Sequence, residues 1–356
     1  TIAATTITVA NNSSGTIDIN YNGNNVVDIN DALVINSVIL SNSTTSTFSF
    51  TATAGNITAT AIDTADKALT ITAASGTVAL VNLDTTSGNV DIDATGTITL
   101  TINTAVTTTS GNIDINSSAG AILTTAGSNS TADLLTTGGT IRLEAATGIK
   151  DSGSLGLDID SATGAVTLVR DGAGVVKVDY IATGDAVTLA ITDSGSGNFE
   201  YDSESTGTLT LGAITLGDGD LTISNVATIA VTAVINTTAG TNDDLSITAG
   251  GTGNITLADV DNILTTGTGA VILNADGDDI TVADSSTGPE ILGTGTITLT
   301  ANVIAASAGN NLGLSGATAL VLNDTGAGVI FIDELAGTTI AATTITVANN
   351  SSGTID

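Results

Sequence analysis

Apolar and polar residues alternate along almost the whole chain in short segments, each of which follows a glycine. Gly88-Asn-Val-Asp-Ile92, Gly111-Asn-Ile-Asp-Ile115 and Gly139-Thr-Ile-Arg-Leu143 are representative. Similar segments begin at Gly55, Gly76, Gly96, Gly164, Gly207, Gly253, Gly269 and Gly295. Alternation after a glycine turn predicts short β-strands, each with one apolar face and one face of Thr, Asn and Asp.

The spacing of these glycines distinguishes between β architectures. Gly55, Gly76 and Gly96 follow one another at steps of 21 (76 − 55) and 20 (96 − 76) along the sequence. A step of about 20 residues that carries two or three short strands is typical of one rung of a parallel β-solenoid. A β-sandwich would need turn signals roughly every 8–12 residues and would end after a few strands. We therefore predict an all-β fold, a parallel β-solenoid (β-helix).

A long internal repeat organises the chain. The segment Thr1–Asp18 recurs without change as Thr339–Asp356, at an offset of 338 (339 − 1). We expect residues 1–338 to be one tandem repeat unit and residues 339–356 to be the start of the next, within a longer array. At about 21 residues per rung, this period predicts about 16 rungs per repeat.

The composition of the chain restricts the core and the chemistry. Hydrophobic residues make up 41% and aromatic residues 2%, so the core must consist of Val, Ile, Leu and Ala. Cys, His, Met and Trp are absent. The chain therefore has no zinc ligands with nitrogen or sulfur donors and no nucleophilic chemistry that depends on His or Cys.

The charge is strongly acidic. The net charge is −31, and the basic residues are Lys67, Arg142, Lys150, Arg170 and Lys177. Nucleic acid and anionic membrane surfaces are excluded as partners because their phosphates require clustered Lys and Arg. No stretch approaches the roughly 20 apolar residues of a membrane helix, so no membrane insertion is expected. We also expect no enzymatic activity, because a β-helix lyase would need basic residues together with aromatic residues that stack sugar rings.

Residues 20–40 depart from the glycine–strand pattern. Side chains with oxygen atoms occur at Asn20, Asn22, Asn24, Asp28 and Asp31, with apolar Val27 between them. This spacing resembles the calcium loop of dockerin-type, EF-hand-like modules, in which oxygen ligands stand at positions 1, 3, 5, 9 and 12 and a helix follows. The resemblance implies a weak Ca²⁺ site at these five residues and one short helix near residues 30–40. Two alternatives stay open: a loop and helix without metal, and plain solenoid strands at Val26–Ile29 and Leu33–Ile35.

Paired carboxylates offer a second candidate chemistry. They lie on or beside predicted strands as Asp91/Asp93, Asp158/Asp160 and Asp278/Asp279. Aspartates two residues apart on a strand project from the same face. We expect these faces to be solvated, with cation bridging between rungs as the alternative reading.

The sequence motifs of the strands and turns resemble those of a known protein family over nearly the whole chain. Gly-Asn-Ile-x-Ile and Gly-Thr-Ile-Thr-Leu strands alternate with Thr-Thr-Ser-Gly and Asp-Ala-Thr-Gly turns. This pattern is similar to that of filamentous-haemagglutinin-type surface proteins. The resemblance implies a right-handed parallel β-helix and an extracellular or cell-surface location.

Two functions follow as expectations. The first is a structural repeat unit of a secreted or cell-surface fibre, which stacks end to end with itself into a long acidic β-solenoid filament. The alternative is an adhesin module that presents a glycan- or cell-binding patch on a β-helix stalk. The candidates for such a patch are the segment Asn20–Leu40 and the aromatic residues Tyr21, Tyr180, Phe199 and Tyr201.

Overall fold

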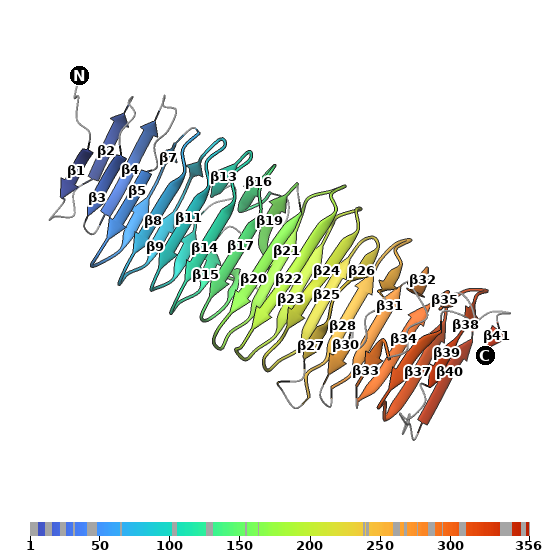
Figure 1. Ribbon diagram of the computed structural model, residues 1–356. Helices are drawn as coiled ribbons and strands as arrows, with labels where there is room; N and C mark the ends of the chain where they lie inside the picture. Colours follow the sequence, from blue (N-terminus) through green and yellow to red (C-terminus); the bar gives the residue numbers. More distant parts are fainter. Residues whose placement is uncertain are drawn as a thin grey trace. The chain divides into compact units, whose positions relative to one another are not determined.

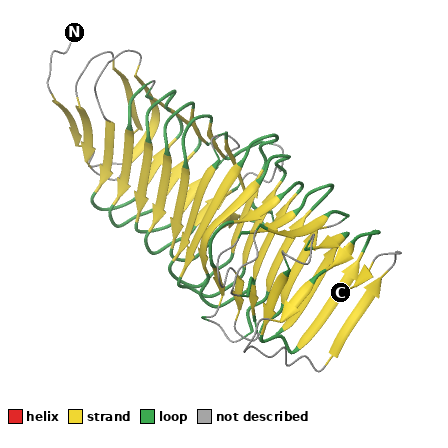
Figure 2. Ribbon diagram, turned by 45° about the vertical axis from the view of Figure 1, so that its right-hand side comes forward, coloured by secondary structure: helices red, strands yellow, loops and turns green. Residues whose placement is uncertain are grey.

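The structure, a computed structural model, describes residues 6–355 with internal gaps. The gaps are 11–15, 22–25, 31–32, 41–47, 65, 102–104, 126–130, 154, 163, 238, 240–241, 259–263, 267–268, 276, 284–288, 294, 306–310, 335–343 and 350–353. Side chains are described within 48–332, apart from these gaps and 264–266, and at 344–348. Every regular element of the described residues is a β-strand (Figure 2). The chain divides into two compact units, Thr1–Ala182 and Thr183–Asp356.

In the first unit, one strand of each turn joins a continuous parallel ladder, which we call the main column (Figure 1). Its strands are β1 (Thr6–Ala10), β3 (Val26–Asn30), β5 (Phe48–Ala52), β8 (Leu69–Ala73), β11 (Val90–Ala94), β14 (Ile113–Ser117), β17 (Ile141–Ala145) and β20 (Ala165–Arg170). All pairs are parallel, so the segments that join them must cross over within each turn.

The rest of each turn in the first unit forms two minor columns of shorter strands. Both columns start from β2 (Thr16–Tyr21) and β4 (Leu33–Leu40). The first minor column continues as β6 (Ile57–Ala59), β9 (Val78–Leu80), β12 (Ile98–Leu100), β15 (Ile122–Thr124) and β18 (Ile149–Asp151). The second minor column is β7 (Ile62–Asp63), β10 (Leu83–Asp84), β13 (Val106–Thr108), β16 (Leu134–Thr136) and β19 (Leu157–Ser161). The two columns diverge from β4, which pairs with both β6 and β7. They converge again on β21 (Val176–Tyr180), which pairs with both β18 and β19.

The second unit has the same kind of topology. Its main column is β23 (Phe199–Ser203), β25 (Leu221–Asn225), β28 (Leu245–Ala249), β31 (Val271–Ala275), β34 (Thr296–Ala301), β37 (Ala319–Asp324) and β40 (Thr344–Asn349). The two minor columns of this unit start from β22 (Val187–Asp193) and β24 (Leu209–Thr215). One continues as β26 (Ile229–Val231), β29 (Ile255–Leu257), β32 (Asp279–Val282), β35 (Val303–Ile304), β38 (Val329–Ile330) and β41 (Thr354–Ile355). The other continues as β27 (Ile235–Thr237), β30 (Leu264–Thr266), β33 (Ile291–Leu292), β36 (Leu312–Ser315) and β39 (Ile332–Glu334). Strand β24 pairs with both β26 and β27, as β4 does with β6 and β7.

The core consists of apolar residues that stack on the same position of successive turns. In the first unit one such ladder is Phe48, Leu69, Val90, Ile113, Ile141 and Val166, all at most 1% exposed. One rung cannot bury its own apolar face, whereas stacked rungs bury it continuously. At about 1.5–3 kcal/mol for each buried aliphatic or aromatic side chain, these ladders are the main stabilising contribution.

The fold prediction is confirmed: the chain is an all-β, right-handed parallel β-solenoid. The turns, however, are often longer than expected. The numbers of register partners Leu69 and Val90 differ by 21 (90 − 69), but those of Ile113 and Ile141 differ by 28 (141 − 113). Where the strands and the turns between them are both described, the solenoid has about 11 turns. The expectation of about 16 rungs for the whole repeat stays a prediction, because parts of the repeat lie outside the described residues.

The prediction of a short helix near residues 30–40 is wrong. Residues Leu33–Leu40 form strand β4, whose residues pair with Ile57 of one minor column and Ile62 of the other. The apolar residues of this segment are compatible with a strand as well as with a helix. The segment is a strand because parallel strands of the next turn pair with it. The alternative reading of residues 26–35 as solenoid strands is the one that the structure supports.

Candidate functional site

Buried threonines and glycines form the corners between the second minor column and the main column of the first unit. The Oγ1 atom of Thr136 donates to the carbonyl of Gly111, one turn earlier, at 2.8 Å, and accepts from the N–H of Gly139 at 3.0 Å. Thr108 stands in the same position one turn before and accepts from the N–H of Gly111 at 3.0 Å. Each hydroxyl therefore satisfies backbone groups of two successive turns inside the protein.

The glycines of these corners have no room for a side chain. A Cβ atom at Gly111 would lie 2.0 Å from the carbonyl oxygen of Gly88, and one at Gly139 would lie 1.9 Å from that of Gly111. The second unit has the same close approach, 2.0 Å from a Gly207 Cβ to the Asp185 carbonyl oxygen. The recurrent glycine of the sequence is thus explained by stacking of backbone on backbone. Sequence reasoning identified the turns but missed the inward threonine three residues before the glycine.

The predicted calcium residues lie only partly within the described chain. Asn20 belongs to β2 and Asp28 to β3, where they pair with residues of β4 and with Thr8 and Ser49. Asn22, Asn24 and Asp31 lie outside the described residues. Over the part of the chain that the structure describes, no group of three or more Asp and Glu residues is placed to hold a metal ion. The dockerin-like Ca²⁺ site stays a prediction, without the helix that should follow it.

An outward ladder of charges runs across the main column of the first unit. Asp91 and Asp114 are register partners, and Asp114 pairs in turn with Arg142. Arg142 donates through Nη1 to Asp114 Oδ1 at 3.0 Å and contacts Glu144 Oε2 through Nη2. Partial burial, Asp93 and Asp114 raise the pKa of the Asp91 carboxyl above its ordinary value. The expected solvated face is present at Asp91, but one arginine neutralises part of it.

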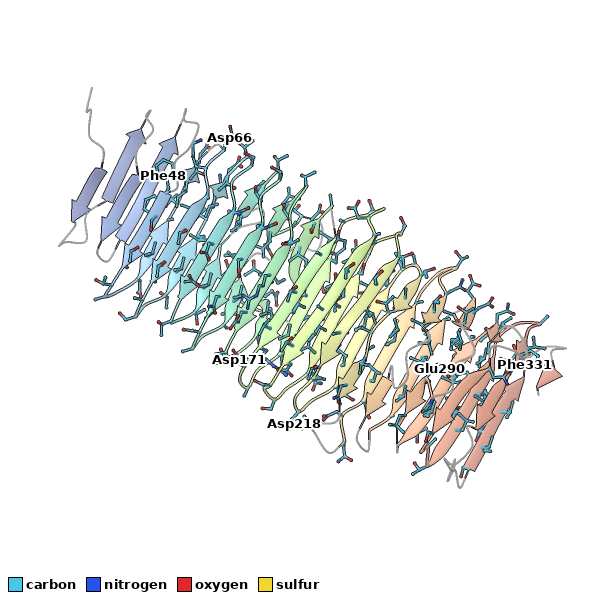
Figure 3. All side chains as sticks on the ribbon, viewed as in Figure 1. Phe48, Asp66, Asp171, Asp218, Glu290 and Phe331 are labelled. Atoms are coloured by element: carbon cyan, nitrogen blue, oxygen red, sulfur yellow. The ribbon has the colours of Figure 1, made fainter. Side chains whose placement is uncertain are left out.

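In two further pairs on the surface, one carboxylate repels the other. The pKa of Asp84 is raised by partial burial and by its register partner Asp63. The pKa of Asp279 is raised by partial burial and by Asp278. Exposed Asp66, Asp171 and Asp218 lie on turns at the margins of the stacked strands (Figure 3). Acidic surface is therefore present in both units.

One group of aspartates lies inside the first unit, where the minor columns converge. Asp133 is 0% exposed and Asp158 is 2% exposed. Asp133 Oδ1 accepts from the hydroxyl of Thr124 at 3.1 Å, and its Oδ2 accepts from the N–H of Asp158 at 3.2 Å. Burial raises the pKa of Asp133 to about 6, with a further contribution from Asp151. The expectation that Asp158 faces solvent is wrong, because its strand β19 packs between β16, which begins directly after Asp133, and β21, which carries Asp179.

Three of the four aromatic residues proposed for an adhesive patch are core residues. Tyr180, Phe199 and Tyr201 are each 0% exposed, and the Tyr180 hydroxyl donates to the carbonyl of Ser161 at 2.5 Å. Tyr21 lies at the end of β2, and its side chain is outside the described residues. The sequence pattern could have indicated this burial, because all three occupy apolar positions of alternating strands.

The basic residues are not grouped into a site. Arg170 is fully buried at the end of β20 and contacts the carbonyl of Gly174. Lys67 is 5% exposed. Among the described residues, no helix is both long and apolar enough to cross a membrane.

The second copy of the repeated segment supplies a feature of a different kind. Strand β40 pairs in parallel with β37, with Ile345 beside Leu320 and Val347 beside Leu322. Ile345 is 62% exposed and Val347 is 41% exposed, whereas Leu320 and Leu322 are each 4% exposed. Within the described residues, strand β40 therefore has one paired edge and carries exposed apolar residues.

Comparison with protein-family models, curated proteins and solved structures finds no match to this chain.

Proposed function

We propose that the chain is the structural repeat unit of a secreted or cell-surface fibre, in which successive repeats stack end to end into a long acidic β-solenoid filament. The observation that carries the proposal is the pairing of β40 with β37, because β40 has the sequence that opens the repeat. The strand that opens a following repeat would thus extend the main column of the second unit. This is how solenoid proteins grow, since each repeat contacts only its neighbours.

The outer surface supports the same function. Outward positions of the strands carry Thr, Ser, Asn and Asp, and the net charge of −31 favours a soluble fibre in a saline medium. The finer assignments, a filamentous-haemagglutinin-like fibre and a dockerin-like calcium loop near β2 and β3, are part of this proposal and rest on the sequence resemblance.

The test is direct imaging of a chain that contains three consecutive copies of residues 1–338. We expect one uninterrupted filament whose length increases equally with each added repeat, with an axial spacing of about 4.7–4.8 Å between strands. A string of separate particles joined by flexible connections would contradict the proposal. The chain with a single repeat and the same extension at residues 339–356 is the matched control for length.

A further inference from the structure

We propose that the outer face of five strands in the second unit is a surface for lateral self-association, which the same face of a second copy of this chain covers. The strands are β25, β28, β31, β34 and β37 of the main column, which lie side by side (Figure 1). Each of them is paired on both edges, from β23 before the first to β40 after the last. The inference goes beyond the proposed function, because it joins fibres side by side, whereas the proposed function joins repeats end to end.

This face consists of two straight rows of outward residues. One row of register partners is Thr222, Ser246, Ile272, Thr298 and Val321. The second row, two residues further along the same strands, is Ser224, Thr248, Asn274, Thr300 and Asn323. None of these side chains is charged, and all of these residues are at least partly exposed. We call the two rows the uncharged face.

The rest of the second unit is acidic, which makes the uncharged face distinctive. Residues 183–356 contain 20 Asp and Glu residues and no Lys or Arg. Two second units therefore cannot form a salt bridge with each other, and approach through their acidic surfaces brings like charges together. On β23, one turn before the uncharged face, Glu200 and Asp202 occupy the corresponding outward positions. The five turns that follow β23 thus offer a surface where two copies can meet without repulsion.

The first row of the uncharged face has a shape that suits a copy of itself. Ile272 is 36% exposed, and Val321 lies outward two strands further on. The shorter Thr298 lies between them, and Ser246 precedes Ile272. Packed sheets interdigitate when large and small side chains alternate. The aliphatic side chains of one copy can therefore occupy the space above the shorter residues of the other.

Polar groups of the second row already have partners within the sheet. Asn323 Nδ2 donates to Thr300 Oγ1 at 3.1 Å, and Ser224 Oγ donates to Asp202 Oδ1 at 2.6 Å. Covering a polar group costs least when its hydrogen bonds persist after water leaves. These contacts therefore lower the cost of removing water from the uncharged face.

The size of the uncharged face predicts weak pairing of single chains. At about 4.8 Å between strands and about 3.3 Å per residue, five strands of about five residues cover roughly 400 Å². Two such faces together bury about 800 Å², less than the roughly 1,200–2,000 Å² of a stable complex. A chain of several repeats carries several such faces, so their contacts act together in one complex. We therefore expect weak association of the native chain and tighter association of joined repeats.

Cysteine trapping in the full chain tests the location of the contact, since the protein has no cysteine of its own. Thr298→Cys places one thiol on the uncharged face, between Ile272 and Val321. Thr188→Cys, on β22, is the matched control, because Thr188 also lies outward and is the more exposed of the two threonines. Under the same mild oxidation, we expect disulfide-linked dimers of Thr298→Cys to form about 10-fold faster or more. Equal rates for the two variants would overturn the proposal.

Sedimentation of the native chain measures the association without a covalent trap. It should strengthen with salt, which screens the surrounding carboxylates. Thr248→Asp with Thr298→Asp places like charges on the uncharged face and should weaken it by about 10-fold or more. Thr188→Asp with Thr192→Asp adds the same charge elsewhere in the second unit and should have a clearly smaller effect. No association at any salt concentration, or equal losses for the two double variants, would overturn the proposal.

Imaging of three joined repeats separates this inference from the proposed function. Filaments that lie in pairs or bundles, and that become single with Thr248→Asp and Thr298→Asp in every repeat, would support both. Uninterrupted filaments that stay single in high salt would support the fibre and overturn the lateral contact. Separate particles would contradict the fibre, while trapping and sedimentation of the native chain would still decide the role of the uncharged face.

Discussion

The hydroxyl of Thr136 lies 2.8 Å from the carbonyl oxygen of Gly111, a residue one full turn earlier in the solenoid. The same hydroxyl oxygen accepts from the N–H of Gly139 at 3.0 Å. One buried side chain thus connects two turns at a corner where regular strand pairing is interrupted. Ser161 repeats the contact one turn later, from its Oγ to the carbonyl of Gly139 at 3.0 Å. These hydroxyls supply the hydrogen bonds that the corners cannot obtain from the strand ladders.

Replacing Thr136 by Val should destabilise the first unit by about 1–3 kcal/mol, because the Gly139 N–H and the Gly111 carbonyl lose a buried partner while the side-chain shape is kept. Thr136→Ser retains the hydroxyl and should cost clearly less. The free energy of unfolding in urea measures both effects. A Thr136→Val protein as stable as the native chain would show that the hydrogen bonds do not matter at this corner.

Gly111→Ala should destabilise by about 3 kcal/mol, because the new Cβ would lie 2.0 Å from the backbone of Gly88 and the stacked turns would have to separate. Gly212→Ala is the matched control, since the nearest atom to its Cβ would be the Leu189 carbonyl oxygen at 3.4 Å. The control should be close to neutral. Thermal unfolding followed by circular dichroism compares them, and a stable Gly111→Ala protein would contradict the close approach.

Asp133 should make stability depend on pH in an unusual direction. Its pKa of about 6 in the folded protein exceeds the unfolded value of about 3.9, so the folded state binds more protons between these values. Stability therefore rises as the pH falls from about 6 to 4, by on the order of 3 kcal/mol for this group alone. Above about pH 6 the buried charge is a constant penalty.

Asp133→Asn removes that charge and keeps oxygen and nitrogen atoms beside Thr124 and Asp158. We expect the variant to unfold at a higher temperature than the native chain at pH 7 and to have a flatter stability profile between pH 4 and 6. Asp66→Asn, at an exposed turn, is the control and should leave the profile unchanged. A lower melting temperature for Asp133→Asn at pH 7 would contradict the assignment.

Arg142→Ala should have a small, salt-dependent effect. The arginine side chain is 39% exposed and that of Asp114 is 46% exposed, so their pair contributes at most about 1 kcal/mol. Its loss removes the cation that lies between Asp114 and Glu144. Melting temperatures in low and high salt should differ more for the variant than for the native chain. An effect that is the same in both would indicate lost packing rather than lost charge.

Calcium binding is predicted from the dockerin-like spacing and can be tested by adding Ca²⁺ or a chelator. With two carboxylates among five ligands, a site there should bind in the millimolar range. Titration calorimetry should therefore detect weak binding that disappears in Asp28→Asn with Asp31→Asn. Asp63→Asn serves as the control, because it removes an acidic residue elsewhere. Binding that survives the double substitution would place the ion outside this segment.

Alternation and glycine spacing were sufficient to predict the strands. Each glycine-led segment named in the sequence is a strand of the structure, from β6 after Gly55 to β34 after Gly295. Period-two alternation leaves few other ways to bury one face, and a step of about 20 residues requires parallel stacking. In the same way, the copies of the repeated segment contain corresponding strands, β1 and β2 in the first and β40 and β41 in the second.

The tertiary structure decided what depends on neighbours from other turns. The run Leu33–Leu40 is a strand because Ile57 and Ile62 pair with it, although its own residues also suit a helix. Asp158 is buried because Asp133 and Asp179, on the turns before and after it, cover it from both sides. Turn length and the hydrogen bonds of the corners likewise could not be predicted from the local pattern. The sequence by itself determined which face of each strand is apolar, since that is a property of consecutive residues. The register of the strands and the hydrogen bonds of the corners depend on contacts between residues a full turn apart in the chain, and only the stacked turns bring those residues together.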